Sequence, residues 1–346
     1  MNAPETAAAV RPAIVAMIPK YGPPGEAATL PPILGTGVIV GDGLVLTNEH
    51  VVEALLKWRW RDPNDKGWPF VAVLLHSLPE GLKEKAFGGG YAEIPLEVLG
   101  VFHLKDLELK ETDFYYGPRR PDFAVVHVKC GGLPSVEFLQ NVDHIQAGMD
   151  VMSMGFPMGT DALTAPGWVH QLSPMLQQGI VSSVLPFPCP NPLGFVTDIP
   201  ALGGASGSPV FLGADPRPIG LLYAGLTQPT SGPVFAAKQV VGKALINVPT
   251  AFSYVVPGHL IAAAINMIKE DGRFALPADA PTLTAILERA TYRPKIRSGE
   301  HGDTRPRENI LLKAPGAIEV GAFSVSAVSI DVPTEPSSAA GDDPEQ

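Results

Sequence analysis

Glycine and proline occur so densely in this chain that long helices are excluded over most of its length. The 346 residues include 36 glycines and 37 prolines, and a proline inside a helix removes a backbone donor and clashes with the preceding turn. Short apolar or β-branched runs lie between these breakers, as is typical of strands. The sequence therefore predicts an all-β fold, a barrel or a sandwich. The runs are 13–18, 36–40, 44–47, 71–76, 94–104, 123–128, 151–154, 179–185, 209–211, 219–226 and 253–256.

Two segments have the apolar spacing of helices. Val51–Trp58 follows an Asn-Glu-His turn. Pro257–Glu270 begins with proline, places apolar residues at helical spacing and meets an Asp-Gly pair at its end, as helix boundaries commonly do. A third, shorter helix is expected within 281–292.

The chain divides into one folded domain and a tail. We assign residues 10–272 to the domain, with a surface insertion within about 53–120, because the interval between two strands there is long. Residues 273–346 are expected to be mostly disordered apart from the short helix. Their end is acidic, contains proline and has no aromatic residue, a composition that cannot bury a core.

Charge and cysteine content exclude several classes of partner. With 25 Lys and Arg against 35 Asp and Glu, the net charge is −10, so nucleic acid is not expected as a partner. No run of 18 apolar residues and no signal-peptide layout are present, which predicts a cytoplasmic protein with no membrane segment. Cys130 and Cys189 lack metal-ligand spacing and are expected to be reduced thiols.

A histidine lies where a predicted hairpin meets a predicted helix. Gly35–Glu53 has apolar residues alternating around a tight Gly-Asp-Gly turn, which predicts two paired strands. The second strand delivers His50 to the start of the helix, so the imidazole is held by rigid elements. A general base needs such a fixed position.

Two further segments add a carboxylate and a hydroxyl. Asp122 immediately precedes the apolar strand 123–128, where it can accept a proton-bearing imidazole nitrogen and fix the tautomer. Ser206 lies in the glycine-rich run 203–208. Backbone N–H groups there can form an anion-binding nest beside a nucleophile, since Gly204 has no Cβ to block the approach. Each segment alone is weak evidence, but the order His, Asp, Ser is specific.

In this order the segments resemble the trypsin-like (chymotrypsin-fold) serine proteases, and the pattern is most similar to the HtrA-type bacterial branch. The resemblance extends from about Pro12 to Lys269. It implies two six-stranded β-barrels followed by a C-terminal helix, with a disordered tail beyond. Further matching segments are GFPMG at 155–159, QGIVS at 178–182, Thr197-Asp198 and FSYVVP at 252–257.

The resemblance also implies roles for individual residues. His50 acts as general base and then general acid, Asp122 orients it, and Ser206 is the nucleophile of an acyl-enzyme mechanism. The N–H groups of Gly204 and Ser206 form the oxyanion hole. No metal and no cofactor are implied, and the partner is a peptide or protein substrate, with a regulatory partner protein as a further expectation.

Three departures from the family pattern are visible. Ala205 occupies the position where digestive trypsins carry an Asp, so activation by N-terminal cleavage is not expected. The interval from His50 to Asp122 is longer than the family's usual spacing. No PDZ-like domain follows the protease unit, which leaves oligomer assembly open.

The specificity pocket is expected to be apolar. The resemblance places it between 197–202 and 220–225, where Asp198 is the one carboxylate. A Lys or Arg side chain would stay unpaired there at a high cost, so cleavage is predicted after small or medium apolar residues. The side chains expected to line it are Ala201, Leu202, Leu221, Leu222 and Tyr223.

Two alternatives remain open at this point. The first is a catalytically silent trypsin-like binding or scaffold module, suggested by Ala205 and the insertion. The second is an α/β-hydrolase esterase, which the residue order disfavours because that class places its serine first, and because Ser208 replaces the final glycine of G-x-S-x-G.

Overall fold

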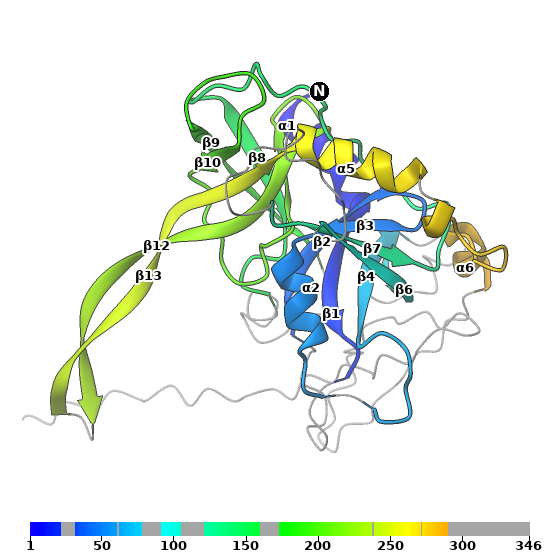
Figure 1. Cartoon of the computed structure of the whole chain (residues 1–346), viewed down its shortest axis with the longest axis horizontal. Coiled ribbons are helices and arrows are strands. Elements are labelled where there is room, and N and C mark those ends of the chain that lie inside the picture. The colour runs from blue at the N-terminus through cyan, green and yellow to red at the C-terminus, as the bar shows by residue number, and fades with distance from the viewer. Residues whose placement is uncertain are drawn as a thin grey trace, which may run out of the picture.

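Two β-sheet units form the body of the described structure (Figure 1). The computed structural model describes residues 1–21, 32–60, 62–77, 91–104, 121–159, 173–236, 239–270 and 272–289. Of the expected disordered tail, residues 290–346 lie outside these ranges, whereas 273–289 are ordered and include the expected short helix, with Leu283 and Leu287 buried in the core. Residues 61, 78–90 and 105–120 of the expected insertion also lie outside them. Within the described part of 53–120, residues 70–77, 91–96 and 98–103 belong to strands of the first sheet.

The first unit is a seven-stranded antiparallel sheet in the order β5-β4-β1-β2-β3-β7-β6. The expected strand 94–104 is divided at Glu97, so the sheet has seven strands where six were predicted. Leu96 still pairs with β4, whereas Val98 already pairs with β7. The stretch 91–103 thus provides both edge strands of the sheet, β5 and β6. The strands are β1 (Ile14–Pro19), β2 (Gly35–Gly41), β3 (Leu44–Thr47), β4 (Phe70–Ser77), β5 (Tyr91–Leu96), β6 (Val98–His103) and β7 (Ala124–Val128).

The second unit is a closed six-stranded barrel in the order β10-β13-β12-β11-β8-β9, as predicted. Closure leaves no free edge where these strands lie within the barrel, which is how antiparallel sheets avoid unpaired backbone groups. Together the two units confirm the chymotrypsin-like architecture. The strands are β8 (Asp150–Gly155), β9 (Met175–Leu185), β10 (Gly194–Thr197), β11 (Pro209–Leu212), β12 (Pro218–Ala236) and β13 (Gln239–Pro257).

One apolar core joins the two units. The larger buried cluster fills the first sheet and continues into the second barrel through Met152, Met154 and Phe211. A smaller cluster fills the second barrel, with Phe195 and Val210 fully buried in it. Each buried side chain of this size contributes roughly 1.5–3 kcal/mol. The shared core therefore fixes the two units against each other, and with them the loops at their junction.

Four α-helices are described: α1 (Ala3–Val10), α2 (Glu49–Leu56), α5 (Gly258–Glu270) and α6 (Leu283–Arg289). The predicted C-terminal helix is α5, which buries Ile261, Ile265 and Ile268. Helix α1 was not anticipated, although Asn2 and Glu5 form a capping box at its start. No helix in the described ranges is long and apolar enough to cross a bilayer.

Strands β12 and β13 are far longer than the sequence indicated. Each has 19 residues, where runs of 219–226 and 253–256 were expected. Their outer halves leave the barrel as a two-stranded ribbon that projects away from both units (Figure 1). Prolines and glycines within 229–242 concealed this continuity, because they mark turns more often than strands.

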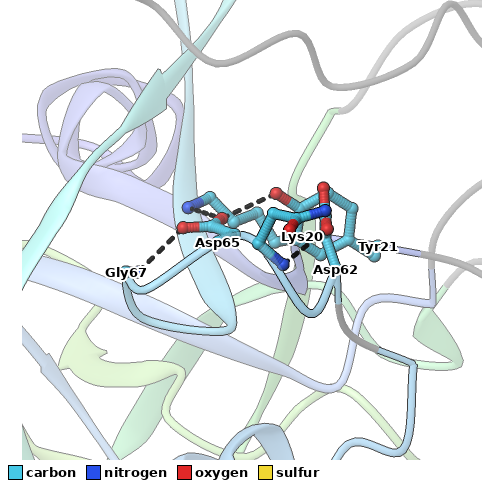
Figure 2. Close-up of polar contacts among 6 residues, drawn as sticks. Lys20, Tyr21, Asp62, Asp65 and Gly67 are labelled. Atoms are coloured by element: carbon cyan, nitrogen blue, oxygen red, sulfur yellow. Dashed lines mark hydrogen bonds and ion pairs between the residues drawn. The ribbon is translucent and has the colours of Figure 1, made fainter.

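A polar clasp fixes the loop that follows α2 (Figure 2). Asp65 accepts hydrogen bonds from Lys20 Nζ at 2.5 Å, Tyr21 Oη at 2.6 Å and the Gly67 N–H at 2.8 Å. Trp58 Nε1 donates to the Tyr21 carbonyl at 2.8 Å. The Lys20 ammonium, followed by the Tyr21 hydroxyl, holds the pKa of Asp65 well below its usual range. In turn, Asp65 raises the pKa of Tyr21 to about 12. The clasp ties the end of α2 to the end of β1.

Candidate active site

His50 and Asp122 meet through two hydrogen bonds. His50 Nδ1 lies 2.5 Å from Asp122 Oδ2, and the His50 N–H donates to Asp122 Oδ1 at 3.2 Å. An ionised carboxylate only accepts, so the proton of the neutral imidazole resides on Nδ1. The His50 side chain is 47% exposed and that of Asp122 26%. Nε2 is thereby left as the basic nitrogen on a solvent-accessible ring.

Strand pairing explains why these two residues meet. Thr47, the last residue of β3, lies opposite Ala124, the first residue of β7. The chain leaves both strands at the same end of the sheet, so residues just beyond them are neighbours. Asn48, which is fully buried, reinforces the junction by donating from Nδ2 to the Asp122 carbonyl at 2.6 Å. The geometry of the pair is therefore a property of one sheet.

The loop that carries Ser206 is shaped by glycine. Gly204 and Gly207 have φ of 89° and 88°, a region that L side chains rarely adopt. The Ala205 N–H donates to the Leu202 carbonyl at 2.9 Å, which closes a turn in front of the serine. Within the described hydrogen bonds, none uses the N–H of Gly204 or Ser206. Two donors in this turn are thus available to an anion.

Thr36, in β2, connects this loop to the first sheet. Its N–H donates to the Ser206 carbonyl at 2.8 Å and its Oγ1 donates to the Gly204 carbonyl at 2.8 Å. Oγ1 also accepts from the Phe156 N–H at 3.0 Å, and the Thr36 carbonyl accepts from Thr47 Oγ1 at 2.7 Å. Thr36 is fully buried. One residue, through its side chain and its backbone, therefore links the serine loop to the strand that ends beside His50.

The Gly-Phe-Pro-Met-Gly turn at 155–159 packs against the serine loop. A Cβ on Gly204 would lie 2.3 Å from the Phe156 carbonyl oxygen, and a Cβ on Gly155 would lie 2.0 Å from Ser208 Oγ. Neither distance is compatible with a side chain. Both glycines are required by this close approach, which leaves no room for the loop to move toward the turn.

The serine loop also lies against the strand that leads to His50. A Cβ on Gly207 would meet the Thr36 carbonyl at 1.9 Å and Thr47 Oγ1 at 2.7 Å, three residues before the histidine. Within the described residues, no hydrogen bond joins Ser206 Oγ to the His50 ring. Catalytic hydrogen bonds are often long without substrate and shorten in the complex.

The comparison with protein families decides the assignment. The model of the trypsin-like peptidase domain matches residues 35–221, more than half of the chain, and this range contains His50, Asp122 and Ser206. This chain is a member of the trypsin-like peptidase domain family. A search of curated proteins found no match.

Solved structures similar to this trypsin-like peptidase include two of the HtrA-type protease AlgW. A variant of AlgW with a tripeptide is 15% identical, with a TM-score of 0.44, and the match covers 79% of this chain and 65% of that one. AlgW with a decapeptide is 16% identical, with a TM-score of 0.43, and the match covers 79% and 69%. This chain thus spans about two thirds of the length of these proteases.

The five side chains expected to line the peptidase's pocket do not all face it. Leu221 and Leu222 are fully buried, one in each core cluster, so only their backbone is available beside the serine loop. Tyr223 is half-buried and stacks on Tyr254, with ring centroids 5.9 Å apart. Ala201 and Leu202 are partly exposed.

The two expected pocket walls touch each other. A Cβ on Gly225 would lie 2.9 Å from the Ala201 carbonyl oxygen, so the space between the walls is narrow at this depth. The Asp198 carboxylate, expected at this pocket, accepts a hydrogen bond through Oδ1 from the Ile180 N–H of β9 at 2.6 Å. At Gly225 the two segments are thus in close contact, and the one carboxylate between them is bonded to the backbone of β9.

Sequence reasoning missed Thr36 and Asn48. Thr36 lies in a Gly-Thr-Gly run, where glycines on both sides of a buried hydroxyl signal a close approach of backbones. Asn48 directly precedes a helix and reads as an ordinary cap, but its side chain bonds to the Asp122 segment instead. Across the described ranges no three His, Cys, Asp or Glu side chains gather as metal ligands would.

Proposed function

We propose that this trypsin-like peptidase is a serine endopeptidase that uses Ser206, His50 and Asp122. The observation that carries the proposal is the 2.5 Å contact between His50 Nδ1 and Asp122. That contact leaves Nε2 basic, while Thr36 ties the serine loop to the strand beside His50. Membership of a peptidase family gives the reaction class.

In the proposed reaction His50 Nε2 takes the Ser206 proton as Oγ attacks the carbonyl carbon of the scissile bond. The resulting imidazolium is stabilised by Asp122, which stays ionised. His50 then gives the proton to the leaving amine, and an acyl-enzyme remains on Ser206. Water, activated by the same Nε2, hydrolyses the ester and restores the serine. The proton that Ser206 loses leaves with the amine, and water supplies both the proton that restores the serine hydroxyl and the hydroxyl group of the acid product.

The N–H groups of Gly204 and Ser206 are proposed to bind the oxyanion. Negative charge develops on the former carbonyl oxygen only in the transition state, and each preset donor is typically worth about 3 kcal/mol of barrier. Both groups are free of competing hydrogen bonds within the described chain. The bond from Thr36 Oγ1 to the Gly204 carbonyl supports this, because it fixes the peptide that follows the first donor.

The substrate preference is proposed to be for small or medium apolar residues before the cleaved bond. The close approach of Gly225 to the Ala201 carbonyl supports a narrow pocket, and the Asp198 carboxylate is already bonded to the Ile180 N–H, so it is not oriented toward a Lys or Arg of the substrate. A buried, unpaired cation would cost several kcal/mol. Of the small and medium side chains, the smallest fit with the least displacement of these walls.

A cleavage profile on a proteome-derived peptide library tests both parts of the proposal. The wild-type chain should generate new termini preceded by Ala, Val or similar apolar residues, and the Ser206→Ala variant should generate none. Cleavage after Lys or Arg would refute the pocket assignment while leaving the nucleophile intact. Identical profiles for the two proteins would refute the triad.

A second candidate function, a catalytically silent binding module, is favoured by one observation. Ser206 Oγ and the His50 ring share no hydrogen bond in the described structure. A fluorophosphonate probe separates the two functions, because it reacts with an activated serine and needs no matching peptide. Labelling of the wild-type chain and not of Ser206→Ala excludes the silent module; absence of labelling in both supports it.

A further inference from the structure

The ribbon formed by the outer parts of β12 and β13 has no function in the proposed reaction. Residues from Thr227 to Ala236 pair with residues from Gln239 to Pro249, while the neighbouring strands β11 and β10 contact only the barrel ends of β12 and β13. In the described chain the ribbon therefore has two unpaired edges. We name it the arm (Figure 1).

An arm of this kind does not stabilise itself. A two-stranded ribbon in water is at best marginally stable, because neither face is covered. The described side chains at its base are solvent-exposed, including Val248 at 41% and Phe252 at 44%. Its unpaired edges also present rows of backbone donors and acceptors. The arm is built to bury surface against something outside its own protomer.

The charge of the arm differs from that of the rest of the chain. No Asp or Glu occurs between Asp215 and Glu270, whereas the whole chain has 35. The stretch 227–249 contains Lys238 and Lys243 and neither Asp nor Glu, so the remainder of the protein carries a net charge more negative than the −10 of the whole chain. The arm is thus the basic, acid-free part of an acidic molecule.

From these observations we propose that the arm docks on the acidic body of a second copy of this chain. The lysines of the arm are attracted to the acidic body of the neighbouring copy, whereas two arms, both basic, repel each other. Contact of one surface with a different surface is heterologous, so the assembly closes as a ring when the rotation permits. Polyanionic partners such as nucleic acid are disfavoured, because the acidic body repels them.

The length of the arm suits this role. Ten strand residues at about 3.3 Å each extend roughly 33 Å beyond the barrel. The Debye length at physiological ionic strength is about 8 Å. Two acidic bodies held apart by the arm therefore repel each other weakly, while the arm contacts the neighbour directly.

Sedimentation velocity over a concentration series tests the proposal, independently of the proposed function. The key variant replaces 228–248 by an Asn-Gly turn between Thr227 and Pro249, which are paired neighbours. The bond from Thr250 Oγ1 to the Leu226 carbonyl, 2.9 Å, stays at the base. All proteins carry Ser206→Ala as well, so self-cleavage cannot imitate dissociation.

The full-length chain should sediment as an oligomer, and the shortened variant as a monomer with an unchanged melting temperature. Lys238→Glu with Lys243→Glu should also give monomer, whereas Lys238→Arg with Lys243→Arg should assemble as the parent does. High salt should weaken the assembly. A full-length chain that is monomeric throughout, or a shortened variant that assembles like the parent, overturns the proposal. Binding of the arm only to an unrelated acidic protein also overturns it.

Discussion

The two halves of the candidate active site are positioned in different ways. His50 and Asp122 follow adjacent strands of one sheet and contact each other through side-chain and backbone bonds. Ser206 belongs to the other unit, and its loop is held by backbone bonds and by glycines that permit close approach. The acid–base half thus depends on local pairing, whereas the nucleophile half depends on contact between the two units.

Thr36 is the connection between these halves. It is the described residue whose hydrogen bonds reach the serine loop, the 155–159 turn and the strand before His50. Damage to the acid–base half should therefore impair proton transfer alone. A substitution at Thr36 should instead shift the Ser206 loop relative to His50 and Asp122. Its effect on the kinetics should therefore differ from that of a substitution in the acid–base half.

The largest effect is expected from removal of the nucleophile. Ser206→Ala should lower kcat on the order of 10⁶-fold, since loss of the serine removes the covalent route. The measurement is single-turnover hydrolysis of a fluorogenic peptide, with the circular dichroism spectrum as the control for folding. Residual activity close to that of the wild-type chain would mean that Ser206 is not the nucleophile.

The next largest effect is expected from Asp122→Asn. The amide preserves the shape but can donate to Nδ1, which favours the wrong tautomer of His50, so kcat should fall about 10⁴-fold. KM should change little. An unchanged kcat would show that the 2.5 Å contact has no part in catalysis.

An intermediate effect is expected at Thr36. Thr36→Val removes the hydroxyl and leaves the Gly204 carbonyl and the Phe156 N–H buried without their partner. A buried group left unpaired costs about 1–3 kcal/mol, so kcat should fall roughly ten- to a hundredfold as the oxyanion donors shift.

Thr36→Ser is the matched control, because it keeps the hydroxyl at the same position. It should restore kcat, with KM near the wild-type value in both variants. Equal losses in Thr36→Val and Thr36→Ser would indicate that packing of the methyl group, and not the hydrogen bond, positions the loop.

The smallest effect on activity is expected at the clasp of Lys20, Tyr21 and Asp65. Asp65→Asn should leave kcat unchanged and reduce stability by about 1 kcal/mol, the usual worth of such a hydrogen bond. Because the pKa of Asp65 is lowered in the folded state, its contribution is complete above the ordinary Asp pKa and is lost as the pH falls below it.

Thermal melts at pH 7 and pH 3 measure this contribution. The difference between Asp65→Asn and the wild-type chain should be visible at pH 7 and smaller at pH 3. Asp279→Asn is the control, since Asp279 is 71% exposed in its ion pair with Lys129 and such pairs contribute little. An Asp65 effect no larger than the Asp279 effect would show that the clasp is not a stabilising element.

Local patterns predicted most of what lies within one sheet. The pattern in Gly35–Glu53 predicted β2, β3 and the start of α2. Alternating apolar residues around a Gly-rich turn determine a hairpin almost independently of the rest of the chain. The position of Asp122 before β7 followed from the same kind of signal. The association of His50 and Asp122 with Ser206 came from the resemblance to the trypsin-like family.

Features that depend on distant contacts were not predictable in this way. The division of one strand at Glu97 reflects two different neighbours, β4 and β7, which no local pattern encodes. The pocket assignment treated Leu221 and Leu222 as lining residues, although alternation places successive side chains on opposite faces and both faces here are core. The length of the arm was hidden by its prolines.

The close contact between Gly155 and Ser208 has a consequence for protein engineering. Since a methyl group on Gly155 would overlap the Ser208 hydroxyl, neither loop can be exchanged alone. Grafting the 155–159 turn from another peptidase without its matching 203–208 loop should yield a chimera in which the two segments cannot pack against each other. Recombination of specificity between relatives must therefore transfer both segments as one cassette.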